Sequence, residues 1–142
     1  MNQPDEVVKQ YLKAIEARDA DAFAALFAAD AVGYHPLFDG PVRGRDAIRA
    51  GEQAVFDAFS DVAVTARSLL GDGSRYAIEV VLTAVNTGPL DMGGGEPLPA
   101  TGRTIELPAT WWLELGEDGL IVEARDYLDT ATLMRQLGLG DV

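Results

Sequence analysis

The sequence has 142 residues, no cysteine, a single histidine and a formal net charge of -12. A chain of this length is expected to form one domain, 1–142, with a core large enough to leave a pocket. The lack of cysteine excludes disulfides, thiolate nucleophiles and cysteine-ligated zinc. The acidic balance argues against nucleic acid as a partner, because binding a phosphate backbone needs basic clusters.

Export and membrane signals are also missing from the pattern. No apolar run reaches membrane-spanning length, and residues 1–20 carry acidic side chains where an export signal is basic and then apolar. We therefore expect a cytoplasmic protein with no membrane partner. The one close basic group is interleaved with acidic residues, which is typical of a salt-paired surface. These residues are Arg43, Arg45 and Arg49 among Asp39, Asp46 and Glu52.

Helices are expected first along the chain. Apolar residues at helical spacing predict helices over 4–18 and 44–59, and a shorter one that Asp19 or Asp21 caps. A short strand over 31–36 lies between the last two helices. From residue 62 the apolar period changes from 3.6 to 2, which predicts strands.

Four strands are expected in the second half, over 62–68, 76–86, 104–115 and 120–128, separated by glycine-rich turns. The Gly- and Pro-rich segment 88–102 is long for a loop and is interpreted as a lid or rim. Asp129 caps a last helix, 131–137, that Gly138 ends. Helices followed by an antiparallel meander predict an α+β domain.

Asp126 is the main functional clue. Alternation over 120–128 places it on the face of the strand that is otherwise apolar. If Leu115 pairs with Leu120, Asp126 lies opposite Ala109 and diagonal to Leu107 and Trp111. Burial would raise the pKa of this carboxyl toward neutrality and fit it for general acid or base catalysis. The alternative is a structural aspartate tied to a backbone amide or an arginine.

His35 is the one side chain whose ordinary pKa lies near neutrality. It could accept a proton or orient a water molecule. The alternation of its short strand groups Tyr34 with Val32 and leaves the direction of His35 open between rim and cavity. A lone histidine excludes multi-histidine metal sites, and no pair of carboxylates has clear ligand spacing, so no metal is predicted.

Tyr11 belongs to the apolar stripe of the first helix, where it either packs in the core or donates a hydrogen bond to a carbonyl or enolate oxygen. Tyr76 and Asn86 stand at the two ends of one apolar strand face and are candidate polar groups of a cavity. Trp111 is expected to line the core or cavity. Trp112, on the opposite face, would suit a contact in a dimer.

Several strings of the sequence resemble, in order, the nuclear transport factor 2-like superfamily, in particular SnoaL-like polyketide cyclases and ketosteroid isomerases. These strings are GRDAIR at 44–49, NTGP at 86–89, ATGR at 100–103, DGLIVE at 118–123, YLD at 127–129 and RQLG at 135–138. The resemblance implies a cystatin-like α+β fold, a cone-shaped curved antiparallel sheet packed on N-terminal helices around an apolar cavity. It also implies a homodimer formed through the sheet.

The resemblance assigns roles to single positions. Tyr11 resembles the oxyanion-hole tyrosine of ketosteroid isomerases, and His35 falls where those enzymes place their aspartate base. Trp111 falls about where they place a second, protonated aspartate. Asp126 falls where SnoaL-type cyclases carry their acid/base aspartate, while the histidine of those cyclases falls near Trp112. Asn86 stands where many SnoaL-like chains have histidine.

The sequence therefore predicts a cofactor-independent cavity enzyme that transfers protons on a small hydrophobic carbonyl compound, as a polyketide cyclase or a steroid isomerase does. Asp126 would be the acid or base, assisted by His35, with Tyr11 or Asn86 stabilising an enolate oxygen. The ligand would contact Asn86, Trp111, Tyr76, Tyr34 and Leu107. The alternative is a non-catalytic binding module for a small hydrophobic metabolite. Convergence of Asp126 and a second polar group on one point of the cavity would favour the enzyme.

Overall fold

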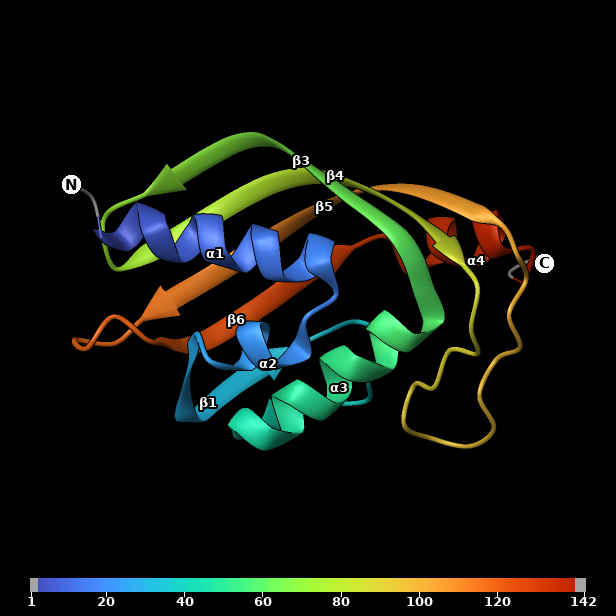
Figure 1. The fold of residues 1–142 in the computed structure, drawn as a ribbon, viewed down its shortest axis with the longest axis horizontal. Coiled ribbons are helices and arrows are strands. Elements are labelled where there is room, and N and C mark those ends of the chain that lie inside the picture. Colours follow the sequence, from blue (N-terminus) through green and yellow to red (C-terminus); the bar gives the residue numbers. More distant parts are fainter. Residues whose placement is uncertain (1–2, 140–142) are drawn as a thin grey trace.

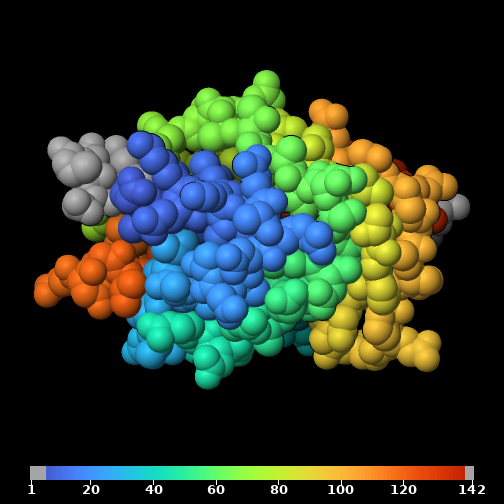
Figure 2. All heavy atoms as spheres, in the orientation of Figure 1, coloured from blue at the N-terminus to red at the C-terminus, as the bar shows by residue number. Residues whose placement is uncertain are grey.

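A curved six-stranded sheet with helices on one face forms the protein, as a computed structural model describes for residues 3–139 (Figure 1). The elements in chain order are α1 (Gln3–Ala17), α2 (Ala20–Ala24), β1 (Phe27–Tyr34), β2 (Val42–Arg43), α3 (Arg45–Ala58), β3 (Phe59–Gly71), β4 (Arg75–Asn86), β5 (Thr104–Leu115), β6 (Ile121–Leu128) and α4 (Thr130–Leu137). Side chains of α1, α2 and α3 cover the sheet in the space-filling view (Figure 2). The predicted α+β fold of the nuclear transport factor 2-like type is confirmed.

The strands follow the order β2-β1-β6-β5-β4-β3. Strands β3 to β6 form the predicted antiparallel meander. Strand β1 joins the sheet parallel to β6, with Gly33 opposite Ala124 and Tyr34 opposite Arg125, so the sheet is mixed. This pairing brings the end of β1 beside the middle of β6.

The register of the β5–β6 hairpin differs from the prediction by two residues. Asp126 lies opposite Trp111, and Ala109 lies opposite Leu128. A bulge near the turn causes part of the difference, because Leu115 pairs with Ile121 and the ladder shifts between residues 114 and 115. The bulge also reverses which side chains face inward at the start of β6. Ile121 is fully buried, whereas Val122, expected to face inward, is 37% exposed.

The main core lies between the sheet and the first three helices. Tyr11, Phe23 and Phe27 pack their rings together there, with centroids 5.1 to 6.4 Å apart. On the other face of β5, the Trp112 Nε1–H donates to Glu114 at 3.0 Å, and the Arg125 guanidinium lies 5.7 Å from the centre of the indole. None of the described helices is long and apolar enough to cross a membrane.

The segment between β4 and β5 is a folded loop that Asn86 anchors. The Asn86 amide donates to the carbonyl oxygens of Ala58 and Gly88 at 3.0 Å, and its oxygen accepts from the backbone N–H and hydroxyl of Thr101 at 2.8 and 3.0 Å. Farther along, Leu90 and Leu98 exchange two backbone hydrogen bonds. These bonds hold both ends and the middle of the loop in place.

Candidate active site

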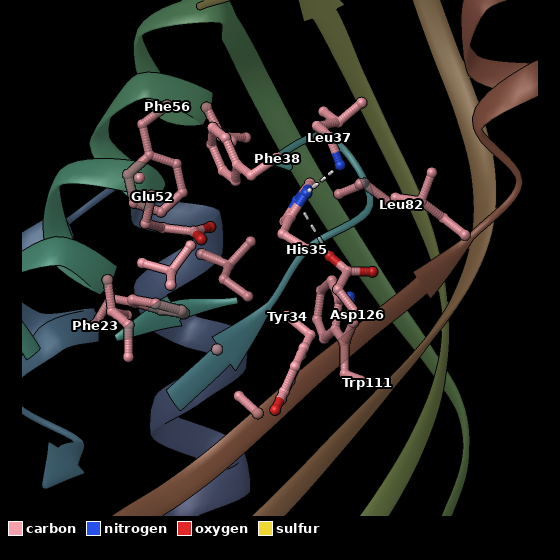
Figure 3. Close-up of a pocket in the computed structure, with 18 of the residues that line it drawn as sticks. Phe23, Tyr34, His35, Leu37, Phe38, Glu52, Phe56, Leu82, Trp111 and Asp126 are labelled. Carbon is pink, nitrogen blue, oxygen red and sulfur yellow. Dashed lines mark hydrogen bonds and ion pairs between the residues drawn. The ribbon is translucent and has the colours of Figure 1, made fainter. Parts of the chain in front are cut away.

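A cavity of about 110 Å³ lies between the sheet and helices α1 and α3. Most of its lining is aromatic or aliphatic, and the acidic and histidine side chains in that lining are Asp126, Glu52 and His35 (Figure 3). An apolar cavity of roughly 150 Å³ is large enough for benzene. The cavity here is smaller than that but partly open to solvent, so it suits a small molecule that need not be wholly enclosed.

Asp126 reaches the cavity from the inward face of β6, between Ala124 and Leu128. Its Oδ1 is buried and accepts no hydrogen bond from the described part of the chain. Burial raises the pKa of this carboxyl to about 7, and the Trp111 side chain opposite it partly offsets the rise. Asp126 is thus balanced between carboxylic acid and carboxylate near neutral pH.

His35 follows the last residue of β1, and the parallel pairing of β1 with β6 sets it beside Asp126. Its Nε2 lies 3.4 Å from Asp126 Oδ2. The Leu37 N–H donates to Nδ1 at 3.1 Å, so a neutral ring carries its proton on Nε2, facing Asp126. Burial lowers the pKa of His35 to about 4. The imidazole is therefore neutral at pH 7. The sequence left His35 open between the rim and the cavity, and the structure places it in the cavity lining.

Glu52 lies in the cavity, which corrects its assignment to a salt-paired surface. It sits on α3 four residues after Ile48 and four before Phe56, both buried and both in the cavity wall. Burial of the carboxyl, and then the negative charge of Asp126, raise the pKa of Glu52 to about 8. The spacing was a usable signal, because an acidic residue on the apolar stripe of a helix is as unexpected as Asp126 on its strand.

Tyr11 points from α1 toward the same space. It is 6% exposed, and its ring meets the Trp111 ring edge to face at 5.6 Å. Burial, followed by the charges of Glu52 and Asp126, holds the pKa of Tyr11 well above its ordinary value. The phenol keeps its proton at any physiological pH and remains a hydrogen-bond donor.

The remaining predicted ligand contacts divide into two groups. Trp111, Tyr34 and Leu107 line the cavity, and Tyr34 is 41% exposed. Tyr76 and Asn86 are buried but lie outside the cavity lining, at the two ends of β4. Among residues 3–139, no cluster of three or more histidine, aspartate or glutamate side chains is arranged to hold a metal ion.

Comparison with known proteins gives a family and several similar folds. A family model described as SnoaL-like domain matches residues 8–124. Curated protein sequences give no match. A structure from Jannaschia sp. CCS1, named as a SnoaL-like polyketide cyclase, superimposes with a TM-score of 0.82 at 18% identity, over 99% of this chain and 93% of that one.

Two further solved structures show the same fold. One is a Catenulispora acidiphila protein with a ketosteroid isomerase-like fold in complex with trimethylamine, with a TM-score of 0.76, 21% identity and coverage of 94% of this chain and 93% of that one. The other is an epoxide hydrolase of M. tuberculosis, with a TM-score of 0.71, 17% identity and coverage of 97% and 91%. Identities this low establish the shared fold alone.

Proposed function

Because the chain belongs to the family of SnoaL-like domains, we propose that it is an enzyme that moves protons on a small, apolar carbonyl compound without a cofactor. The observation that carries this proposal is the convergence of Asp126, His35 and Tyr11 on one apolar cavity. A binding module would need only one polar anchor. Three groups with complementary proton states favour catalysis.

Asp126 would act as the general base. In its ionised form it takes a proton from the carbon next to the carbonyl, and the electron pair of that C–H bond moves onto the carbonyl oxygen. Return of the proton to another carbon gives an isomer. Attack of the enolate carbon on a second carbonyl gives a ring, and the alkoxide formed at that carbonyl takes the proton back from Asp126. The Tyr11 hydroxyl donates to the enolate oxygen, where negative charge develops.

His35 would position this base. Its Nε2–H faces Asp126 Oδ2, while Oδ1 has no partner from the described residues. The Leu37 N–H fixes the imidazole in the tautomer that donates to the carboxylate. His35 is thus a positioning residue, and its low pKa keeps it from competing with Asp126 for the proton.

Opening of an epoxide by water has less support from this site. That activity is named for the M. tuberculosis protein, and a carboxylate paired with an arginine is one arrangement that would activate the attacking water. Arg125 is the arginine of the cavity lining, and its guanidinium is bound to Glu123 at 2.6 Å and to Glu114 at 3.5 Å. Proton transfer next to a carbonyl is the simpler chemistry for a neutral imidazole and a carboxyl of pKa about 7.

Hydrogen–deuterium exchange tests the proposal directly. Small cyclic ketones are incubated with the protein in D₂O at pH 7.5, and loss of the signal of the hydrogens next to the carbonyl is followed by proton NMR. We expect enhanced exchange with the wild type and a loss of about 100-fold or more in Asp126→Asn. Asp61→Asn, at an exposed aspartate, is the matched control and should exchange like the wild type. Ketone binding without enhanced exchange would contradict the enzyme and support the binding module.

A further inference from the structure

We propose that Glu52 is a second catalytic residue, whose neutral carboxylic acid donates a hydrogen bond to the substrate oxygen while Asp126 takes the proton. This inference deepens the proposed function and rests on it. In this arrangement Glu52 on α3 is the hydrogen-bond donor and Asp126 on β6 is the base. The two residues reach the cavity from opposite walls, α3 and β6 (Figure 3).

The surroundings of Glu52 support this role. The side chain points from α3 into the cavity, among apolar residues that include Phe23 and Phe56 (Figure 3). No described residue hydrogen bonds to its carboxyl or forms an ion pair with it. Its neighbour Gln53, which lies on another side of α3, is bound to Asp57. Glu52 is half-buried and its carboxyl opens on the cavity, so a ligand that enters the cavity can form a hydrogen bond with it.

The charges around Glu52 keep it protonated. Tyr11 faces it from α1, Asp126 from β6 and His35 from the end of β1, and none of these is a cation at neutral pH. Three arginines near this part of the fold are engaged elsewhere: Arg49 with Asp21 at 2.6 Å, Arg18 with the Phe56 carbonyl oxygen at 2.9 Å and Arg125 with Glu123 at 2.6 Å. With no opposing charge, burial raises the pKa of Glu52 to about 8.

The division of labour follows from this arrangement. Asp126 removes the proton from carbon, the electron pair moves to oxygen, and Glu52 and Tyr11 share their protons with that oxygen without losing them. The substrate class is then a small neutral ketone or diketone. An anionic substrate is disfavoured, because the cavity offers it a partly ionised Asp126 and no free cation.

The pH profile of ketone exchange separates this role from a structural one. The wild type should show a bell, rising near pH 7 as Asp126 ionises and falling near pH 8 as Glu52 ionises. Glu52→Gln keeps a neutral donor that does not titrate, so it should retain the rate within about tenfold and lose the alkaline limb. Glu52→Leu should lose about 100-fold, mainly in kcat. Glu117→Gln, an exposed matched control, should leave both limbs in place.

Carboxyl NMR gives a readout that needs no turnover. In protein labelled with ¹³C at glutamate carboxyls, one resonance should titrate near pH 8 and vanish in Glu52→Gln. A Glu52 carboxyl that titrates near its ordinary value of about 4.3 would overturn the inference, as would an alkaline limb that persists in Glu52→Gln. If the wild type enhances exchange and Glu52→Leu enhances it equally, the role of Glu52 would be overturned while the proposed enzyme would stand. Absence of exchange in the wild type would overturn both proposals.

Discussion

Asp126 and His35 show how one environment shifts two pKa values in opposite directions. Removal from water disfavours the charged form of each group, which raises the pKa of the acid and lowers the pKa of the base. Between about pH 4 and pH 7 the contact of 3.4 Å therefore joins two neutral groups, and above pH 7 it joins a carboxylate to a neutral imidazole. An imidazolium–carboxylate ion pair is not the resting state, so the proton that moves during catalysis belongs to Asp126.

His35→Phe tests this positioning. The variant keeps a ring in contact with Phe38 but removes the Nε2–H that faces the carboxylate. Loss of that donor should raise the pKa of Asp126 further, by up to about one unit, and shift the acid limb of the exchange profile to higher pH. Tyr34→Phe, at the adjacent residue, is the control and should leave the acid limb where it is. An acid limb that stays in place in His35→Phe would show that the imidazole does not act on Asp126.

At the scale of elements, α3 combines the acid with a glycine that leaves space for the ligand. Gly51 lines the cavity, and a Cβ added there would meet the Phe38 ring at 3.5 Å, an ordinary contact. Gly51→Ala should therefore stabilise the fold by about 1 kcal/mol through helix propensity. The same methyl group should narrow the cavity and slow exchange on larger rings more than on small ones.

Urea unfolding of Gly51→Ala measures the first effect, and exchange on a series of ring sizes measures the second. Ala54→Gly, on the same helix, is the reverse control and should destabilise by a similar amount. A destabilised Gly51→Ala would mean that the added methyl group strains the contact with Phe38. Equal slowing of all rings would mean that the cavity wall does not select for size.

The loop between β4 and β5 is anchored by one side chain, that of Asn86. The residue is 2% exposed and makes four hydrogen bonds, so Asn86→Ala should leave the Gly88 carbonyl oxygen and the Thr101 N–H without a partner and remove one of the bonds to the Ala58 carbonyl oxygen. We expect a loss of about 3 kcal/mol in the free energy of unfolding, measured in urea. Gln53→Ala removes one exposed bond to Asp57 and should cost less than about 0.5 kcal/mol. A loss below about 1 kcal/mol in Asn86→Ala would show that the loop is held by other contacts.

The sequence predicts single helices and strands better than it predicts the contacts between them. Alternation predicts the strand of Asp126 and its inward face, because that face is a local property of β6. The direction of His35 depends on the parallel pairing of β1 with β6, which no local pattern reveals. The spacing of Glu52 on the apolar stripe of α3 is a usable signal, but the charged residues around it mask that spacing. The role of Asn86 is not predictable, because its partners come from α3 and the loop after β4.

At the scale of the whole molecule, the buried acids should set how stability depends on pH. The folded pKa values of Asp126 and Glu52 lie above their unfolded values, so the folded state binds more protons and stability falls as pH rises toward 7 and 8. His35, with its folded pKa near 4, acts in the opposite sense up to about pH 6.5. The two acids outweigh the one base, and the net charge of -12 adds repulsion at high pH.

We therefore expect the free energy of unfolding to fall by roughly 4 kcal/mol between pH 5 and pH 8. Urea unfolding at each pH measures this decline. The double variant with Asp126→Asn and Glu52→Gln should flatten it, since neither amide titrates, whereas Asp61→Asn should not. Stability that rises between pH 5 and pH 8 in the wild type would show that both carboxyls are solvated.

The parallel pairing of β1 with β6 has a consequence for how the protein is made. During synthesis the N-terminal helices and β1 leave the ribosome early, and β6 follows near the end of the chain. Until then β1 has an open edge where β6 will dock, and His35 has no carboxylate beside it. A chain that stops before β6 would expose the unpaired backbone groups of β1, which are prone to aggregation, and would lack the base Asp126. The unpaired edge of β1 would thus mark such a chain for chaperones and proteases, and the same chain would lack Asp126 and with it the proposed activity.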